Sequence, residues 1–167
     1  MYYFAYCTWL DGAEIHRYWK DAKLVTTGYV ANHKLKFHAA SDRKDRGWCH
    51  FDNTAKVAWG EKALGAVFEH PPEHFEEDFD DFERCCMTVY GDDGKMYDCW
   101  TYRLSRPGIE MRPPNFYWEH IPEGFKQFNF PQEYVGKVIN VYNDAAECPR
   151  ADRPNPSAVP GRGADTR

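Results

Sequence analysis

The stretch CCMTVYGDDGKMYDCWTYRL, residues 85–104, carries the clearest fold signal in the sequence. Two runs rich in β-branched and aromatic residues flank the step Gly91-Asp92-Asp93-Gly94. An Asp-Gly pair accommodates the positive φ angles of a tight turn, so the stretch predicts a β-hairpin. Any fold of this chain therefore contains two long antiparallel strands near its middle.

Further strands are predicted on the N-terminal side of the hairpin. The runs 2–6, 57–59 and 63–70 are short and apolar, and residues 24–40 alternate over a length that suits one or two strands. The polar residues 41–47 predict a loop. Strands therefore outnumber helices, which favours an α+β fold.

Helices are predicted at three places. Apolar side chains recur at helical spacing over 13–20 and over 131–142. A third helix is predicted from Pro71 to about Phe82, because proline suits a first helical turn and the acids that follow favour its positive end. Residues 105–124 contain four prolines and predict a long irregular loop, of the kind that often acts as a lid.

Length and composition indicate one domain. The 167 residues suffice for a substantial core, and tyrosine, phenylalanine and tryptophan outnumber leucine, isoleucine and valine, so rings must fill much of it. After residue 143 the chain is rich in proline and glycine and lacks aromatic residues. We predict a folded domain over 1–143 and a disordered tail over 144–167.

Charge and cysteine usage exclude several classes of protein. The net charge is -5 and no stretch combines clustered basic residues with aromatics, which argues against nucleic acid as a partner. No apolar run approaches the roughly 20 residues that cross a bilayer, and the first residues do not resemble a signal peptide. The 6 cysteines contain no C-x-x-C motif, which predicts reduced thiols, mostly in the core. We expect a soluble cytoplasmic protein without a membrane partner.

Residues 69–83 concentrate negative charge, with acidic side chains and no lysine or arginine. On a helix that turns by about 100° per residue, Glu83 borders the stripe formed by Phe75, Phe79 and Phe82. The other acids are mostly expected on a solvated face. A carboxyl group at the edge of a buried aromatic face is partly desolvated, which raises its pKa and suits it to proton transfer. Glu83 is therefore the candidate general acid or base.

Two other chemistries are weaker candidates. His70 and His74 are four residues apart, but the prolines between them prevent both from facing one site on a helix, and no further metal ligands follow at a recognisable spacing. We therefore predict no metal site. Cys7 directly follows the first strand and could act as a nucleophile, but no histidine is identifiable as its base.

Six short motifs recur in an order and spacing known from one family of enzymes. They are Tyr3-Phe4-Ala5-Tyr6 before a polar loop (YFAYGSN in that family), His33-Lys34-Leu35-Lys36-Phe37 (FKLDF), Gly65-Ala66-Val67-Phe68 (WGVVW), Phe79-Asp80-Asp81-Phe82-Glu83 (LDxxE), Trp100-Thr101-Tyr102 (RSY) and Tyr134-Val135-Gly136-Lys137-Val138 (YTGKV). Over roughly residues 2–140 the chain thus resembles the gamma-glutamylcyclotransferases, including those that act on gamma-glutamyl amines.

The resemblance implies a small, mixed, six-stranded β-barrel flanked by helices, and a lyase that needs no cofactor. Such an enzyme would be a monomer or a homodimer and would release an amine or amino acid from a small gamma-glutamyl compound, with formation of 5-oxoproline. Glu83 would be the catalytic residue. The residues implied in substrate binding are Tyr6, Cys7, Thr8, Trp9, Leu10 and Tyr102.

The sequence departs from the family pattern in two places. Cys7-Thr8-Trp9 stands where the family has Gly-Ser-Asn, and the GxxSGxY stretch expected after the catalytic glutamate is missing beyond Glu83. Two alternatives therefore stay open. One is a non-catalytic protein that binds a small ligand on the same fold, and the other is an amide hydrolase that releases glutamate.

Overall fold

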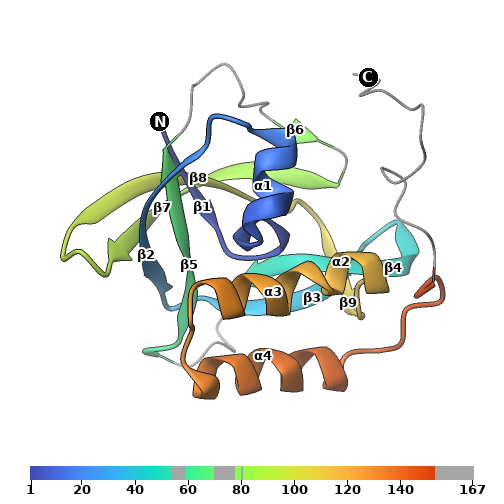
Figure 1. The fold of residues 1–167 in the computed structure, drawn as a ribbon. Coiled ribbons are helices and arrows are strands. Elements are labelled where there is room, and N and C mark those ends of the chain that lie inside the picture. The colour runs from blue at the N-terminus through green and yellow to red at the C-terminus, as the bar shows by residue number, and fades with distance from the viewer. Residues whose placement is uncertain (54–58, 70–77, 80, 153–167) are drawn as a thin grey trace.

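The computed structural model describes residues 1–53, 59–69, 78–79 and 81–152 of the chain (Figure 1). Its strands are β1 (Tyr2–Ala5), β2 (Lys23–Ala31), β3 (Lys34–Ala40), β4 (Arg43–Asp52), β5 (Lys62–Glu69), β6 (Asp78–Phe79), β7 (Phe82–Gly91), β8 (Met96–Leu104) and β9 (Pro107–Glu110). Its helices are the 3-10 helix η1 (Thr8–Leu10) and the α-helices α1 (Gly12–Tyr18), α2 (Asn115–Trp118), α3 (His120–Gln127) and α4 (Gln132–Asp144).

The larger sheet closes into a barrel. Its strands follow the order β2-β5-β1-β8-β7-β6, and β2 also pairs with β7 at Gly28 and Tyr29. This second pairing closes a ring of five strands, in which β1 runs parallel to β8 and antiparallel to β5. A mixed barrel is thus confirmed, but the predicted six-stranded ring is wrong, because the two-residue β6 pairs only with β7 and stays outside it. Gly28 allows the closure, since a Cβ there would clash with the Tyr90 carbonyl oxygen.

A second, three-stranded sheet has the order β4-β3-β9. Helix α4 packs on β3, and α3 packs on η1, so helices flank the two sheets (Figure 1). On the helix side of β3, the buried Phe37 contacts the rings of Trp118 and Tyr142. The core is rich in aromatic rings, as the composition predicts, and Phe4, Phe37 and Phe51 are fully enclosed.

Several local predictions are confirmed. The hairpin pairs residue by residue from Phe82 opposite Leu104 to Tyr90 opposite Met96. Strands form within 2–6, 24–40 and 63–70, and α1 and α4 lie where helical spacing predicts them. Residues 57 and 58 lie outside the described residues, and Trp59, at the end of that predicted strand, lies in a turn.

Three local predictions are wrong. Most of the expected loop 41–47 belongs to β4, because pairing with β3 outweighs its polar composition. The expected irregular loop 105–124 contains β9, α2 and the start of α3. The helix expected up to Phe82 has given way to strands at 78–79 and from Phe82 onward, while residues 71–77 lie outside the described part.

The domain boundary predicted after residue 143 lies at the end of α4. Directly beyond it, Ala145 and Cys148 are buried, and Ala146 forms a β-bridge with Met111. Residues 153–167 of the predicted tail lie outside the described residues. In the described part of the chain, no helix is long and apolar enough to span a membrane.

Candidate active site

The loop after β1 holds five of the predicted substrate-binding residues. Tyr6 and Cys7 leave the strand, and Thr8, Trp9 and Leu10 form η1. The Leu10 N–H donates to the Cys7 carbonyl oxygen at 3.0 Å, and the Leu10 side chain is fully buried. Leu10 therefore anchors the loop, whereas Thr8 and Trp9 are half-buried and can meet a ligand.

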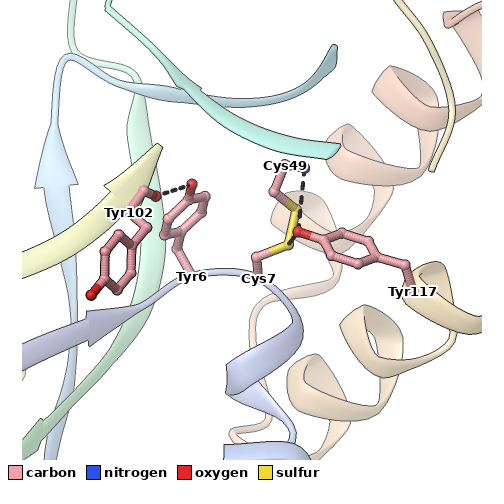
Figure 2. The surroundings of a disulfide bond; sticks show 5 residues. All are labelled: Tyr6, Cys7, Cys49, Tyr102 and Tyr117. Carbon is pink, nitrogen blue, oxygen red and sulfur yellow. Dashed lines mark hydrogen bonds between the residues drawn. A yellow bond between two sulfur atoms is a disulfide. The ribbon is translucent and has the colours of Figure 1, made fainter. Parts of the chain in front are cut away.

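Tyr6 joins this loop to the barrel. Its hydroxyl donates to the Tyr102 carbonyl oxygen at 2.7 Å (Figure 2). Its ring stacks on Phe51 with the ring centroids 3.6 Å apart. Burial raises the pKa of Tyr6 well above its usual value, so the hydroxyl stays a hydrogen-bond donor. Trp9 in turn contacts the Tyr102 ring edge to face, with centroids 6.2 Å apart. The structure therefore brings Tyr6, Trp9 and Tyr102 together.

Cys7 forms a disulfide with Cys49 of β4 (Figure 2). The Tyr117 hydroxyl oxygen lies 3.3 Å from Cys7 Sγ and accepts a hydrogen bond from the Cys49 N–H at 3.4 Å. The expectation of six reduced thiols is thus wrong for this pair. In the disulfide Cys7 has no thiolate to act as a nucleophile.

Glu83 does not sit at the end of a helix. It lies on β7 directly opposite Arg103 of β8, and Arg103 Nε donates to Glu83 Oε1 at 2.7 Å. Both side chains are about one-third exposed. The predicted setting at the edge of a helical aromatic stripe is therefore wrong, and a guanidinium group is the immediate partner of the carboxylate.

The sheet topology nevertheless places Glu83 and the loop at the same end of the barrel. Strand β8 runs parallel to β1, so its last residues lie beside the end of β1, where Tyr6 bonds to Tyr102. Strand β7 runs antiparallel to β8, so Glu83, near its start, lies next to Arg103. Three neighbouring strands thus deliver the loop, the arginine and the glutamate to one region.

Other potentially reactive groups contribute little here. Cys85 lies two residues after Glu83, but burial raises its pKa to about 11, which keeps the thiol protonated. No group of three His, Cys, Asp or Glu in the described residues could hold a metal ion. His70 and His74, weighed above as zinc ligands, lie outside the described residues.

Sequence reasoning missed three residues of this region: Cys49, Arg103 and Tyr117. Cys49 could not be chosen as the partner of Cys7, since six cysteines without regular spacing specify no pairing. Tyr117 lies on α2, within residues 105–124, for which the sequence predicts an irregular loop and no specific contacts. Arg103 could have been identified from the sequence. It lies next to Tyr102 in the predicted hairpin, where a charged residue is expected to pair with an opposite charge on the facing strand.

Comparison with known proteins bears on the fold. No protein-family model and no curated protein matches the sequence. Among solved structures, a gamma-glutamyl cyclotransferase aligns with a TM-score of 0.69 and 20% identity, over 83% of this chain and 86% of that one. The chain has the fold of this cyclotransferase.

Two further solved structures share the gamma-glutamyl cyclotransferase-like fold. An uncharacterized protein from Homo sapiens aligns with a TM-score of 0.66 and 18% identity, over 83% of this chain and 85% of that one. YkqA from Bacillus subtilis aligns with a TM-score of 0.66 and 19% identity, over 88% of this chain and 55% of that longer one. The fold thus occurs in proteins of different length.

Proposed function

We propose that the protein is a cyclotransferase-like lyase that cleaves a small gamma-glutamyl compound into 5-oxoproline and a free amine or amino acid. The observation that supports the proposal is that Glu83 and the β1–η1 loop (residues 6–10) belong to the same end of a barrel with the gamma-glutamyl cyclotransferase-like fold. The motif order over residues 2–140 agrees with this assignment.

The proposed reaction is intramolecular. The α-amine of the substrate attacks its own γ-carbonyl carbon, so the protein has only to hold the folded conformer and move protons. The α-ammonium group first releases one proton to solvent, and Glu83 then takes a second proton from the attacking amine as the C–N bond forms. The bond to the leaving amine then breaks, and Glu83 returns the proton to that amine. The carboxylate is regenerated, so no cofactor is consumed.

Each neighbouring group has a proposed role. Arg103 holds Oε1 of Glu83, which orients the carboxylate and leaves Oε2 for proton transfer. The backbone N–H groups of Thr8 and Trp9 stabilise the substrate carboxylate or the developing oxyanion. The half-buried ring of Trp9, beside Tyr102, supports the leaving amine.

The test is incubation with a panel of gamma-glutamyl amines and amino acids while 5-oxoproline is measured. Glu83→Gln removes the proton carrier but keeps the size of the side chain, so kcat should fall by about 100-fold or more. Glu133→Gln is the matched control, because Glu133 is an exposed acid on α4, and it should retain activity. Unchanged turnover in Glu83→Gln would contradict the assigned role.

The ion pair supports a second candidate, a non-catalytic protein that binds a small ligand. Arg103 Nε already bonds to Oε1 of Glu83, and this ion pair between facing strands would serve equally well in a protein that performs no proton transfer. In the same panel this candidate predicts a ligand that binds and is recovered unchanged. Free glutamate in place of 5-oxoproline would instead indicate an amide hydrolase, in which water attacks.

We further propose that the protein acts in the cytoplasm, as a monomer or a homodimer, on a small molecule rather than on nucleic acid or membrane. The net charge of -5 and the four cysteines without a disulfide support this setting. Size-exclusion chromatography with light scattering would determine the oligomeric state.

A further inference from the structure

We propose that the Cys7–Cys49 disulfide is a redox control of the β1–η1 loop, and that a thiol reductant switches the candidate active site between a fixed and a relaxed state. This inference rests on the proposed function only in so far as the loop binds substrate. The structural part of it concerns the loop itself and can be tested without turnover.

The disulfide connects the two sheets of the protein. Cys7 follows β1 of the barrel, whereas Cys49 belongs to β4 of the three-stranded sheet, and the described strands of the two sheets share no ladder. The stack of Tyr6 on Phe51 joins the same two segments without a covalent bond. Phe51 also stacks on Phe4 of β1, so reduction would leave noncovalent ring contacts between the end of β1 and β4 and would remove the covalent connection.

Tyr117 lies against both halves of the bond. Its hydroxyl oxygen is 3.3 Å from Cys7 Sγ and bonds to the Cys49 N–H (Figure 2). Burial raises the pKa of Tyr117 above its usual range, and a hydrogen bond with the Thr8 side chain opposes that rise. Tyr117 is thus a positioning residue that contacts the disulfide and the first residue of η1, and it can transmit a change at the sulfur atoms to the loop.

The other four cysteines indicate that the Cys7–Cys49 disulfide belongs to a protein of a reducing compartment. Cys85, Cys86, Cys99 and Cys148 all carry free thiols, and Cys86 is exposed. Secreted domains stabilised by disulfides seldom keep several thiols free. In reducing compartments a single disulfide is usually transient and serves catalysis or redox sensing.

The switch is an ordinary thiol–disulfide exchange. A thiolate of a dithiol attacks Sγ of Cys7, because Cys7 is the more accessible half of the bond. Its exposed fraction is 8%, and that of Cys49 is 1%. The S–S bond breaks, its electron pair stays on Cys49 Sγ, and that sulfur takes a proton. The second thiol of the dithiol then displaces Cys7 Sγ and closes a cyclic disulfide. Two electrons and two protons have passed to the protein, and the dithiol is oxidised.

The first experiment measures the loop directly. Alkylation under denaturing conditions should label four thiols in the oxidised protein and six after treatment with dithiothreitol. Hydrogen exchange of the amides in residues 7–11 should become about tenfold faster or more on reduction, because the covalent constraint is lost. The β7–β8 amides should exchange at the same rate in both states.

The matched control is the double variant Cys7→Ser with Cys49→Ser, which keeps the other four thiols. Its exchange should not respond to dithiothreitol, so any response of the remaining cysteines is detected. Six labelled thiols before reduction, equal loop exchange in both redox states, or the same response in the control would overturn the proposal.

The second experiment links the switch to the proposed function. With a substrate identified from the panel, kcat/KM for 5-oxoproline release should differ by about tenfold between the oxidised and reduced protein, which corresponds to about 1.4 kcal/mol. Reoxidation with glutathione disulfide should restore the first value. If no compound of the panel is turned over in either state, the proposed function fails, while hydrogen exchange still decides whether the redox control exists. If turnover occurs and does not respond to reduction, the control of the site is refuted.

Discussion

The β1–η1 loop and the β7–β8 turn are both short connections at the edge of the barrel, but different kinds of contact fix them. In the turn, the Gly91 N–H donates to the Lys95 carbonyl oxygen at 2.8 Å, and the Gly94 N–H donates to the Gly91 carbonyl oxygen at 3.0 Å. In the loop, Cys7 bonds to Cys49, which lies 42 residues away in the sequence. The turn is therefore closed by its own hydrogen bonds, with one further bond from the Asp92 N–H to the Thr27 carbonyl oxygen of β2. The loop adds to its own hydrogen bonds a covalent bond to the other sheet.

This difference explains why one region is suited to a structural role and the other to control. A turn fixed by local contacts keeps its shape as long as its two strands pair. A loop fixed by contacts between two sheets changes when those sheets or the bond between them change. The following predictions test that contrast, beginning with the largest expected effect.

Removal of the disulfide should be the most destabilising change. In the double variant Cys7→Ser with Cys49→Ser, the free energy of unfolding should fall by about 4 kcal/mol relative to the oxidised protein, because the unfolded chain regains the entropy of an open loop. Urea denaturation monitored by tryptophan fluorescence measures the difference. Cys86→Ser, at an exposed free thiol, should change it by less than about 0.5 kcal/mol. Equal effects of the two variants would show that the junction does not depend on the bond.

Mild acid should lower the free energy of unfolding through His50, which lies on β4 between Cys49 and Phe51, two residues that contact the β1–η1 loop. Burial and the neighbouring His38 lower the pKa of His50 from 6.5 to about 4. Between pH 6.5 and 4 the His50 side chain is protonated in the unfolded chain but stays neutral in the folded protein. The free energy of unfolding therefore falls as the pH drops from 6.5 to 4. The difference of about 2.5 between the two pKa values corresponds to a loss of about 3 kcal/mol in the free energy of unfolding.

Urea denaturation at several pH values between 7.5 and 4 tests this effect. His50→Gln cannot take up the proton, so its stability should depend less steeply on pH over this interval, whatever its stability at pH 7.5. The same dependence in both proteins would mean that His50 is not held neutral by its surroundings.

Changes within the turn should have the smallest effect. Gly94 has a φ of +80°, a conformation that an L-residue adopts with strain, so Gly94→Ala should lower the free energy of unfolding by about 1 kcal/mol. Gly136→Ala is the control, since a Cβ there meets nothing within 4 Å, and alanine should stabilise α4 by about 0.5 to 1 kcal/mol. The pairing of Cys7 with Cys49 should persist in both variants. A loss of this disulfide in Gly94→Ala would contradict the independence of the two regions.

The same contrast governs what could be predicted from the sequence. The hairpin and α4 were predicted correctly, because turn residues and side-chain periodicity act within a few residues. The polar composition of the first half of β4 predicts a loop. These residues form a strand because they pair with β3, a tertiary contact that composition does not reveal. Glu83 was singled out as a candidate, but its place on a strand opposite Arg103 could not be foreseen from a helical projection.

The sequence by itself therefore determined the order of strands and helices in most of the described chain, the aromatic core, and the set of residues worth testing. Only the tertiary structure decided that five strands close the ring and that Cys7 joins Cys49 beside Tyr117. The physical reason is separation along the chain. Local conformation follows from neighbouring residues, whereas the partner of a cysteine or of a barrel strand depends on which distant segments the tertiary structure brings together.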